Sequence, residues 1–452
     1  WYVVLGCGAV PRVRALARYG GWARRERTPA MLRLAGPRAD HRAAGLVCVG
    51  GGFAGLSAAR RLTQLEPGAR IVLLEAGRIA KGAAGRNSGF MIDLPHELTS
   101  HDYAGSGDDG AIIALNRQAI AFARAAVAEY GINPAYFEEC GKVNGAVSAA
   151  AHAHNLSYSN HLTSLGEAHE HLDAQAMREL TGSGYYRSGL VTPGTVMLQP
   201  AGYIRGLAAG LAQDVAIHED SPVTSLAREG PDWTATTPGG SVTAPRVILA
   251  ANGHLESFGF ERGRLMHVFL YASMTEELDA GALARLGGAP RWGVTPSDPM
   301  GTTMRRIDNA QGGNRIVTRT FSTLRSGMTT SARDLARAAR VQRRKFDRRF
   351  PQLADVAMEY IWAGHLCLTL NSVSVMRELE PGLVSACVQN GLGTARGTLT
   401  GIGAAEIACG EESAITRHFT AEDRPKKLPP QPFRDAGANA IMRWREWRAR
   451  DE

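Results

Sequence analysis

Residues 46–55 read Leu-Val-Cys-Val-Gly-Gly-Gly-Phe-Ala-Gly, and Glu75 ends the next apolar run of the chain. The apolar stretch predicts a short buried strand over 46–49 that runs into a glycine-rich turn. The spacing after the turn predicts a helix over 54–65, and the next apolar run predicts a second strand over 70–74. Strand, turn, helix and strand in this order predict a βαβ unit that binds a dinucleotide.

Each special residue of this unit has a physical role. Gly50 permits the tight turn, Gly52 lets the backbone approach a pyrophosphate, and Gly55 lets the helix pack close to the strand. The helix N-terminus offers N–H groups and the positive end of a dipole to the phosphates. Glu75, which lies 20 residues after Gly55, can accept the ribose hydroxyls. The alternative is a glycine-rich turn that binds nothing.

Length and composition limit the possible classes of protein. The chain has 452 residues, which predicts two domains or one domain with a large insertion. Its hydrophobic fraction of 44% is ordinary for a globular protein, and we expect no transmembrane segment because no run reaches about 18 apolar residues. The net charge of +8 comes almost wholly from residues 1–45, which hold nine Arg and two acidic residues. The charge is therefore no argument for binding nucleic acid.

The first 43 residues have three possible interpretations. They begin with Trp1 and are rich in Arg, Ala and Gly. They are a targeting or disordered arm, a packed extension, or the translation of an upstream frame. The Arg-rich, acid-poor composition is similar to that of a transit peptide, whereas no basic stretch precedes an apolar core as in a secretory signal. We favour a dispensable N-terminal arm over 1–43.

Cysteine and histidine usage predicts the compartment and argues against a metal. The six Cys are scattered and form no CxxC pair, which is typical of reduced thiols in a cytoplasmic protein. Five His lie between residues 152 and 171, without a nearby Cys and without HExxH spacing. We interpret them as a solvated helical surface and predict no metal site.

A second glycine cluster lies near the end of the globular part. Residues 389–401 read Gln-Asn-Gly-Leu-Gly-Thr-Ala-Arg-Gly-Thr-Leu-Thr-Gly, and a helical pattern follows over 402–409. Gly391 and Gly393 therefore predict another helix N-terminus that allows close approach of the backbone to a ligand. The alternative is a structural turn. A loop of small and polar residues over 76–90 also follows Glu75.

Together these segments resemble the D-amino-acid-oxidase and sarcosine-oxidase superfamily of FAD enzymes. The resemblance is closest to the gamma-glutamylputrescine-oxidase-like branch, because of Trp-Ala-Gly at 362–364, Thr-Leu-Asn at 369–371 and the Pro-rich tail. It covers about residues 44–450. The matching segments are 49–55, 75–76, 82–89, the strand at Val223, 247–253 and 362–401.

The resemblance implies an α/β FAD-binding domain, a glutathione-reductase-like Rossmann variant. It also implies a discontinuous α+β substrate domain built on a mostly antiparallel sheet. The FAD-binding domain would comprise 44–95, 196–257 and 361–423, and the substrate domain 96–195 and 258–360. Residues 424–452 would form a Pro-rich linker and a C-terminal helix.

The resemblance also implies which residues bind FAD. Those at the pyrophosphate and adenosine would be Gly50, Gly52, Phe53, Ala54, Gly55, Glu75, Ala76, Val223 and Ala251. Those near the flavin ring would be Arg86, Asn87, Ser88, Gly391, Leu392, Gly393 and Thr394. We expect noncovalent FAD, because the flavin-linked Cys of sarcosine oxidases would align near Gly364 and not at Cys367.

One departure concerns the substrate. Amino-acid oxidases of the superfamily carry an Arg that grips the substrate carboxylate, and the matching position here is Leu366. The absence of this bidentate clamp favours amines or bulkier conjugates over simple α-amino acids.

The expected reaction is oxidation of a C–N bond in an amine or amino-acid-like molecule. Hydride passes to flavin N5, the imine hydrolyses, and O2 reoxidises the flavin with release of H2O2. One alternative is a dehydrogenase subunit that passes electrons to a partner or a quinone, and another is a nucleotide-binding protein without catalysis. The candidates for catalysis are Arg305, Arg396 and His365, each with a structural role as its alternative. The partners would be a small-molecule substrate and an electron acceptor, and the oligomeric state stays open.

Overall fold

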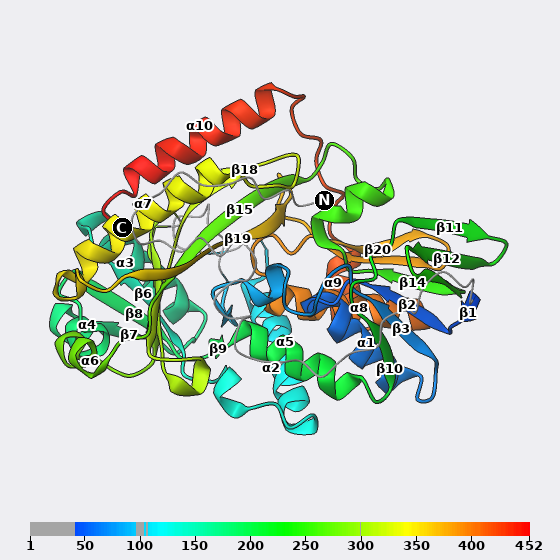
Figure 1. The fold of residues 1–452 in the computed structure, drawn as a ribbon, viewed down its shortest axis with the longest axis horizontal. Coiled ribbons are helices and arrows are strands. Elements are labelled where there is room, and N and C mark those ends of the chain that lie inside the picture. Colours follow the sequence, from blue (N-terminus) through cyan, green and yellow to red (C-terminus); the bar gives the residue numbers. More distant parts are fainter. Residues whose placement is uncertain (1–40, 96–103, 105–106, 299) are drawn as a thin grey trace.

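The structure is a computed structural model that describes residues 41–95, 104, 107–298 and 300–452. The expectation for the N-terminal arm therefore lies almost wholly outside the described residues. Two large sheets dominate the fold, and they lie at opposite ends of the molecule in Figure 1.

The first sheet has six strands and begins with the segment that opened the sequence. All neighbouring strands are parallel except the last pair, which is antiparallel. The order is β10 (Val215–His218), β3 (Ile71–Leu74), β2 (Leu46–Val49), β14 (Arg246–Leu249), β21 (Leu383–Cys387) and β20 (Val375–Glu380). Strands β2 and β3 are buried along their whole length, as is typical of a parallel sheet covered on both faces.

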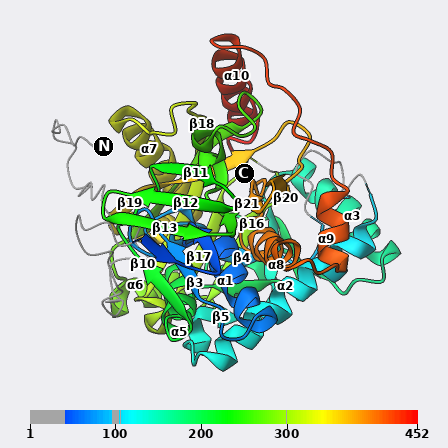
Figure 2. The same ribbon diagram turned by 90° about the vertical axis from the view of Figure 1, so that its right-hand side faces the viewer.

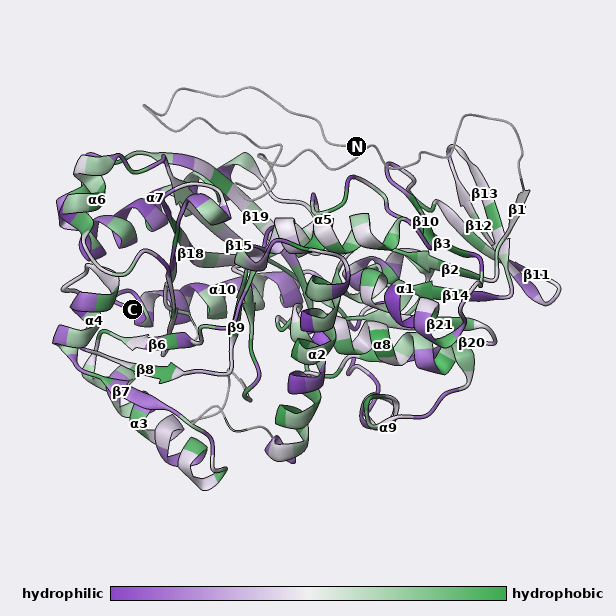
Figure 3. Cartoon of the chain, turned by 90° about the horizontal axis from the view of Figure 1, so that it is seen from below, coloured by the Kyte–Doolittle hydropathy of each residue, from purple (hydrophilic) through white to green (hydrophobic). Residues whose placement is uncertain are grey.

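Strand alternation explains how both faces of this sheet are covered. Leu46 and Cys48 of β2 pack in a core with helices α1 (Phe53–Leu65) and α8 (Ala395–Cys409), which also pack on each other (Figure 2). Val47 and Val49 point the other way and pack with Trp233 and Val242. Trp233 and Val242 belong to a four-stranded sheet of β1 (His41–Ala43), β13 (Gly240–Ala244), β12 (Asp232–Thr237) and β11 (Ser225–Glu229). Figure 3 shows β2 and β3 as hydrophobic.

The second sheet has eight strands and is mostly antiparallel, with one parallel pair between β16 and β6. Its order is β19 (Met358–Leu368), β15 (Met266–Thr275), β18 (Arg315–Leu324), β17 (Thr303–Ile307), β16 (Trp292–Pro296), β6 (Lys142–Ala146), β8 (Ser188–Thr192) and β7 (Glu170–Leu172). Helix α7 (Ala332–Arg349) packs against one face of β15, β18 and β19, and α10 (Phe433–Arg448) packs beside β18 (Figure 1).

Smaller elements connect the two large sheets. A three-stranded sheet joins β4 (Phe90–Met91), β9 (Val196–Leu198) and β5 (Phe137–Glu138). The remaining helices are α2 (Asp109–Glu129), α3 (Ala149–Ser164), α4 (Ala174–Thr181), α5 (Pro200–Leu211), α6 (Ala280–Leu286) and α9 (Ala414–Thr420). Short 3-10 helices are η2 (Ala83–Gly85), η3 (Pro134–Tyr136), η4 (Asn252–Phe258), η5 (Asn309–Gln311) and η6 (Pro351–Leu353).

Side-chain caps fix where most α-helices of the described chain begin, and α1, α8 and α10 lack them. Asp108 caps α2, Ser148 caps α3, and Gln199 caps α5 ahead of its first-turn proline. By contrast, the residues immediately before α1 and α8, Gly52 and Thr394, make no capping hydrogen bond through a side chain. The N–H groups at these two helix starts are therefore available to another acceptor.

The basic residues of 332–349 predict a helix with a solvated charged face. The helix forms as α7, but its basic side chains are not all solvated, because Lys345 and Arg349 are buried. The Lys345 ammonium donates hydrogen bonds to the carbonyl oxygens of Ala449 and Glu452, at 3.0 and 2.5 Å, which anchors the C-terminal end of the chain.

Among the described helices, only α2 is long and apolar enough to cross a membrane, by length and composition alone. One face of α2 lies in the main core and packs against α5 and α8, which accounts for its hydropathy.

Candidate cofactor and substrate site

A continuous cavity of about 4080 Å³ runs between the two large sheets. It begins at the glycine turn after β2, passes the first residues of α8, and reaches the inner side of β15, β18 and β19. Of the residues for which a cofactor role was predicted, all except Gly55 line it, including Ala76, Val223 and Ala251. The fold therefore brings together segments that are more than 300 residues apart in sequence.

The glycine turn has the geometry that the sequence predicted. Gly50 has a φ of +111°, and a Cβ there would lie 2.6 Å from the carbonyl oxygen of Ala250. A Cβ on Gly55 would lie 1.8 Å from the carbonyl oxygen of Gly50, so only glycine allows α1 to pack this close to β2. A Cβ on Gly52 would meet only the Cβ of Ala84, at 3.6 Å. The start of α1 is therefore open toward the cavity.

Glu75 is held in a fixed orientation at the end of β3. Its Oε2 accepts a hydrogen bond from the N–H of Gly51 at 2.8 Å, and its Oε1 accepts one from the N–H of Gly77 at 2.9 Å. Burial raises the pKa of Glu75, while these two hydrogen bonds act to lower it. Each carboxylate oxygen keeps a second lone pair, which can accept a hydrogen bond from a ribose hydroxyl.

The loop at 86–89 is fixed by hydrogen bonds within its own segment and by hydrogen bonds from Arg305 of β17. Asn87 donates to the carbonyl oxygen of Ala84 at 2.6 Å and accepts from the N–H of Gly89 at 2.8 Å. Arg305 is fully buried and donates to the carbonyl oxygens of Ser88, at 3.1 Å, and Leu198. It also donates to Oε1 of Gln311 at 3.0 Å. Arg305 therefore contacts the backbone of the loop and positions it.

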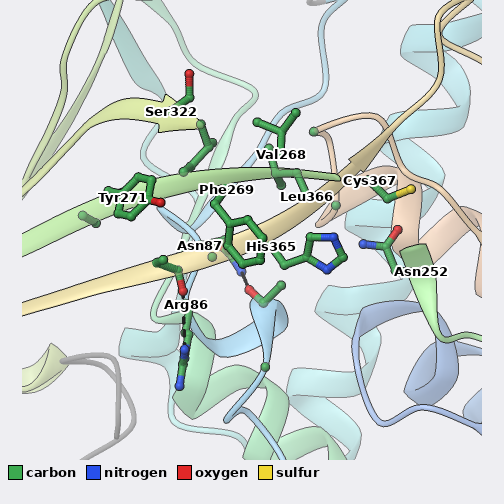
Figure 4. Close-up of a pocket in the computed structure, with 18 of the residues that line it drawn as sticks. Arg86, Asn87, Asn252, Val268, Phe269, Tyr271, Ser322, His365, Leu366 and Cys367 are labelled. Carbon is green, nitrogen blue, oxygen red and sulfur yellow. Dashed lines mark hydrogen bonds between the residues drawn. The ribbon is translucent and has the colours of Figure 1, made fainter. Parts of the chain in front are cut away.

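Further bonds tie this loop to the second sheet and to α8. The indole N–H of Trp362 on β19 donates to the carbonyl oxygen of Arg86 at 2.9 Å. The Arg86 guanidinium donates to the carbonyl oxygen of Ala363 at 3.4 Å, and Figure 4 shows Arg86 and Asn87 beside this strand. Thr394, the residue immediately before α8, donates from its hydroxyl to the carbonyl oxygen of Phe90 at 2.7 Å. The loop and the start of α8 are therefore held in one fixed arrangement.

The second glycine cluster forms an open helix start. Gly391 has a φ of +86°, and a Cβ on Gly391 or Gly393 would meet no atom within 4 Å. Asn390 holds the turn in place, since its Oδ1 accepts from the N–H of Thr369 and its Nδ2 donates to the carbonyl oxygen of Val373, both at 2.8 Å. Leu392 also lines the cavity.

These features fit FAD. Two helix starts without side-chain caps open into one cavity, and an oriented carboxylate lies beside the first of them. The first helix start suits a pyrophosphate, and the second suits the electron-rich end of a flavin ring. A model of the FAD dependent oxidoreductases (DAO) matches residues 46–407. The chain belongs to this family.

Known proteins extend the comparison. The chain is 25% identical to a probable oxidoreductase OrdL of Rhizobium meliloti (strain 1021) over 389 residues, which cover 83% of this chain and 85% of the relative. It is 26% identical to the gamma-glutamylputrescine oxidoreductase of Escherichia coli (strain K12) over 398 residues, which cover 86% and 87% of the two chains. Among solved structures, glycine oxidase from Geobacillus kaustophilus has a TM-score of 0.68 at 18% identity and covers 82% of this chain and 96% of its own. The family resemblance and the FAD cofactor expected from the sequence are thus confirmed.

Arg396 contributes to an ion-pair cluster beside α8. Its Nε donates to the hydroxyl of Ser374 at 2.7 Å, and it forms an ion pair with Glu422. Its guanidinium also lies 5.5 Å from the ring centre of Phe419. These contacts tie α8 to α9, so the geometry gives Arg396 a structural role, and its catalytic role stays a prediction.

His365 belongs to a hydrogen-bonded chain of three side chains. Its Nε2 lies 3.1 Å from Nδ1 of His267, and Nε2 of His267 lies 2.8 Å from a carboxylate oxygen of Glu256. When His267 is neutral and donates from Nε2 to this carboxylate, its Nδ1 accepts a hydrogen bond from Nε2 of His365. Burial, followed by the neighbouring His267 and His254, lowers the pKa of His365 to about 3.

The strand pattern decides which way His365 points. Trp362 and Gly364 face the carbonyl oxygen of Arg86, and a Cβ on Gly364 would lie 3.8 Å from it. His365 therefore projects from the opposite side of β19, where its ring stacks on Phe269 at 5.0 Å between ring centres (Figure 4). The catalytic role of His365 stays a prediction, and its contacts couple η4 to β15 and β19.

The remaining sequence hypotheses can be placed on the same strand and nearby. Gly364 offers no thiol at the position where the resemblance puts a flavin-linked Cys, and Cys367 is buried in the core on the other side. The His-rich segment makes internal hydrogen bonds, such as His161 to Asp109 at 2.8 Å. Within the described residues, no group of three or more His, Cys, Asp or Glu side chains could hold a metal ion.

Sequence reasoning did not single out Arg319, a cationic residue of the cavity wall. Arg319 lies on β18 and lines the cavity. The alternation of β18 is a weak signal, because Arg319 has the same parity as the core residue Val317 but is charged. No sequence motif marks it.

Proposed function

We propose that this protein oxidises a C–N bond of an amine or amino-acid-like molecule with FAD. The observation that carries the proposal is the chamber in front of the 86–89 loop. This loop and the start of α8 are tied together through Phe90, and the inner side of the second sheet faces them. A flavin ring on this platform would present one face to the chamber. The gamma-glutamylputrescine oxidoreductase relative supports a C–N bond as the target.

The division of labour follows from this geometry. Bound FAD would supply the two-electron acceptor for a hydride from the carbon next to nitrogen, with O2 as the final oxidant, H2O2 as its product, and water to hydrolyse the imine. The chain's own residues would bind and orient. Helix α1 and Glu75 would hold the nucleotide half, and Gly391 to Thr394 would offer backbone N–H groups to the ring. Placement of the carbon near its acceptor would supply much of the rate.

Three finer assignments belong to this proposal. FAD is bound noncovalently, since Gly364 replaces the thiol. The division into a FAD-binding domain and a substrate domain follows the boundaries given from the sequence. The protein works in a reducing compartment, the cytoplasm, because Cys48, Cys367 and Cys387 are buried free thiols and the exposed Cys140 is also unpaired.

The test is an anaerobic reduction experiment on the FAD-loaded protein. A panel of primary and secondary amines, with and without carboxylates, is mixed with the enzyme while flavin absorbance is recorded. We expect at least one amine to bleach the flavin, and readmitted O2 to restore the colour with one H2O2 per turnover. Bleaching by no amine would refute the proposal. Bleaching without reoxidation by O2 would instead indicate a dehydrogenase that needs another acceptor.

A further inference from the structure

Arg319 differs from the other cationic side chains of the second sheet. Arg305 donates to four neighbouring groups, Arg306 donates to the carbonyl oxygen of Ala289 at 2.8 Å, and Arg315 pairs with Glu359 at 2.6 Å. The Arg319 side chain makes no hydrogen bond or ion pair with any residue of the described chain, and its Nε is buried without a partner. The residue is partly exposed and lines the cavity, so its guanidinium is accessible to a ligand there.

The strand register fixes which way Arg319 points. On β18 it lies between Ala272 of β15 and Thr303 of β17. Ala272 pairs in turn with Trp362, whose indole reaches the 86–89 loop, and Thr303 is two residues from Arg305, which binds the same loop. Arg319 thus projects from the inner side of the sheet, between two side chains that contact the loop.

The surroundings of Arg319 leave its charge unbalanced. Its neighbours on the adjacent strands, Ala272 of β15 and Thr303 of β17, carry no charge. Burial alone lowers the pKa of Arg319, to about 10, so the side chain keeps its positive charge at neutral pH. Asp298 also lines the cavity, but it accepts from the N–H of Met300 at 2.8 Å and forms no ion pair with Arg319.

We propose that Arg319 binds the carboxylate of the substrate, so that this protein oxidises amines that carry a carboxylate group. The inference rests on the function proposed above. Arg319 on β18 would bind the carboxylate in place of the arginine that is absent at Leu366 on β19. A guanidinium binds a carboxylate through two parallel hydrogen bonds, which balances the charge and satisfies its donors. A phosphate would bring about two charges to a single unpaired cation, so a carboxylate is the better match.

The new position changes where the carboxylate lies. Arg319 is two strands from β19, about 10 Å, and its row meets β19 at Trp362, about 14 Å along the strand from Leu366, by ordinary strand spacing and rise. The carboxylate would therefore sit beside the 86–89 loop rather than at the end of β19. A substrate whose amine and carboxylate are separated differently from those of an α-amino acid fits this placement.

Carboxylate binding is tested with benzoate, and its neutral isostere benzamide is the control. Both are titrated into the FAD-loaded enzyme, with flavin absorbance and melting temperature as readouts. We expect benzoate to bind at least about 10-fold more tightly than benzamide, and Arg319→Met to weaken benzoate alone by about 10- to 100-fold. Arg319→Lys should fall between the two. Arg333→Met removes an exposed charge of α7 that does not line the cavity, and it should change the affinity for neither ligand.

Each result tests whether Arg319 binds a carboxylate, separately from whether the protein oxidises amines. Equal binding of benzoate and benzamide to the natural protein would overturn it, and this comparison needs no variant that folds. Unchanged benzoate affinity in Arg319→Met or in the near-isosteric Arg319→Gln would also overturn it. Tighter binding of methylphosphonate than of benzoate would show that the ligand is a phosphate type. If amines still bleach the flavin in these cases, the proposed function stands and only the role of Arg319 is wrong.

Discussion

Replacement of Gly55 by alanine should weaken FAD binding and the fold together. Helix propensity alone predicts the opposite, because alanine is favoured over glycine inside a helix by up to about 1 kcal/mol. The structure sets a larger opposing term, since the new Cβ would lie 1.8 Å from the carbonyl oxygen of Gly50. A tolerable carbon–oxygen contact is about 3.3 Å, so α1 must move by about 1.5 Å.

The magnitude follows from the atoms that have to yield. The obstacle is backbone, with the Gly50 carbonyl carbon also at 2.9 Å, and it cannot rotate away as a long side chain can. Overpacking of this kind costs about 1–3 kcal/mol. Because the shift moves the helix start that holds the pyrophosphate, we expect a loss of FAD affinity of about 5- to 140-fold.

The assay measures FAD affinity by flavin absorbance after dialysis, together with the melting temperature of the loaded protein. Gly437→Ala is the matched control, because Gly437 lies inside α10 and a Cβ there would meet no atom within 4 Å. Propensity then acts alone, and this variant should melt at the same or a higher temperature. A Gly55→Ala protein that keeps its FAD and melts like Gly437→Ala would refute the steric reasoning.

Three other predictions follow from the site. Arg305→Met leaves the carbonyl oxygens of Ser88 and Leu198 without their donor, so the loop should loosen at a cost of about 3 kcal/mol; urea unfolding and proteolysis within 86–89 measure this, and unchanged values would count against the positioning role. The pKa of His365 is depressed from 6.5 to about 3, so the unfolded chain takes up a proton first as pH falls. Stability should therefore decline between about pH 6.5 and 3, and His365→Gln should flatten that decline in melting curves; identical slopes would contradict the shift. Removal of FAD should lower the melting temperature, since free FAD at 100 times its dissociation constant adds about 2.7 kcal/mol, and an apoprotein that melts like the loaded protein would show that FAD does not bind the native state.

Local pattern was sufficient for much of the fold and for the cofactor. Three elements follow from apolar spacing and turn residues: the strand at 46–49, the helix predicted over 54–65 and found at Phe53–Leu65, and the strand predicted over 70–74 and found at Ile71–Leu74. The roles of Gly50 and Gly55 also follow, because a short turn between strand and helix leaves no room for a Cβ. The burial of Lys345 and Arg349 in the basic helix α7 could not be predicted, because charged side chains are usually exposed.

The contacts of the catalytic candidates could not be predicted from the sequence, and the cause is physical. Charge and position near a motif mark Arg305, Arg396 and His365, but they do not say which acceptor each side chain meets. The acceptors come from distant segments: Ser88 and Leu198 for Arg305, Glu422 for Arg396, and His267 for His365. A cation that is satisfied by such contacts has little left to offer a substrate.

The sequence by itself determined the dinucleotide turn, the acid at Glu75 and the family of FAD oxidoreductases. All of these depend on residues close together in the chain, where glycine conformation and strand or helix period act directly. Only the tertiary structure decided which cationic side chains of the second sheet have hydrogen-bond or ion-pair partners and which has none. The reason is that these partners are brought together by strand pairing across the sheet. The glycine turn at 50–55 therefore identifies the cofactor, and the unpaired Arg319 points to the substrate.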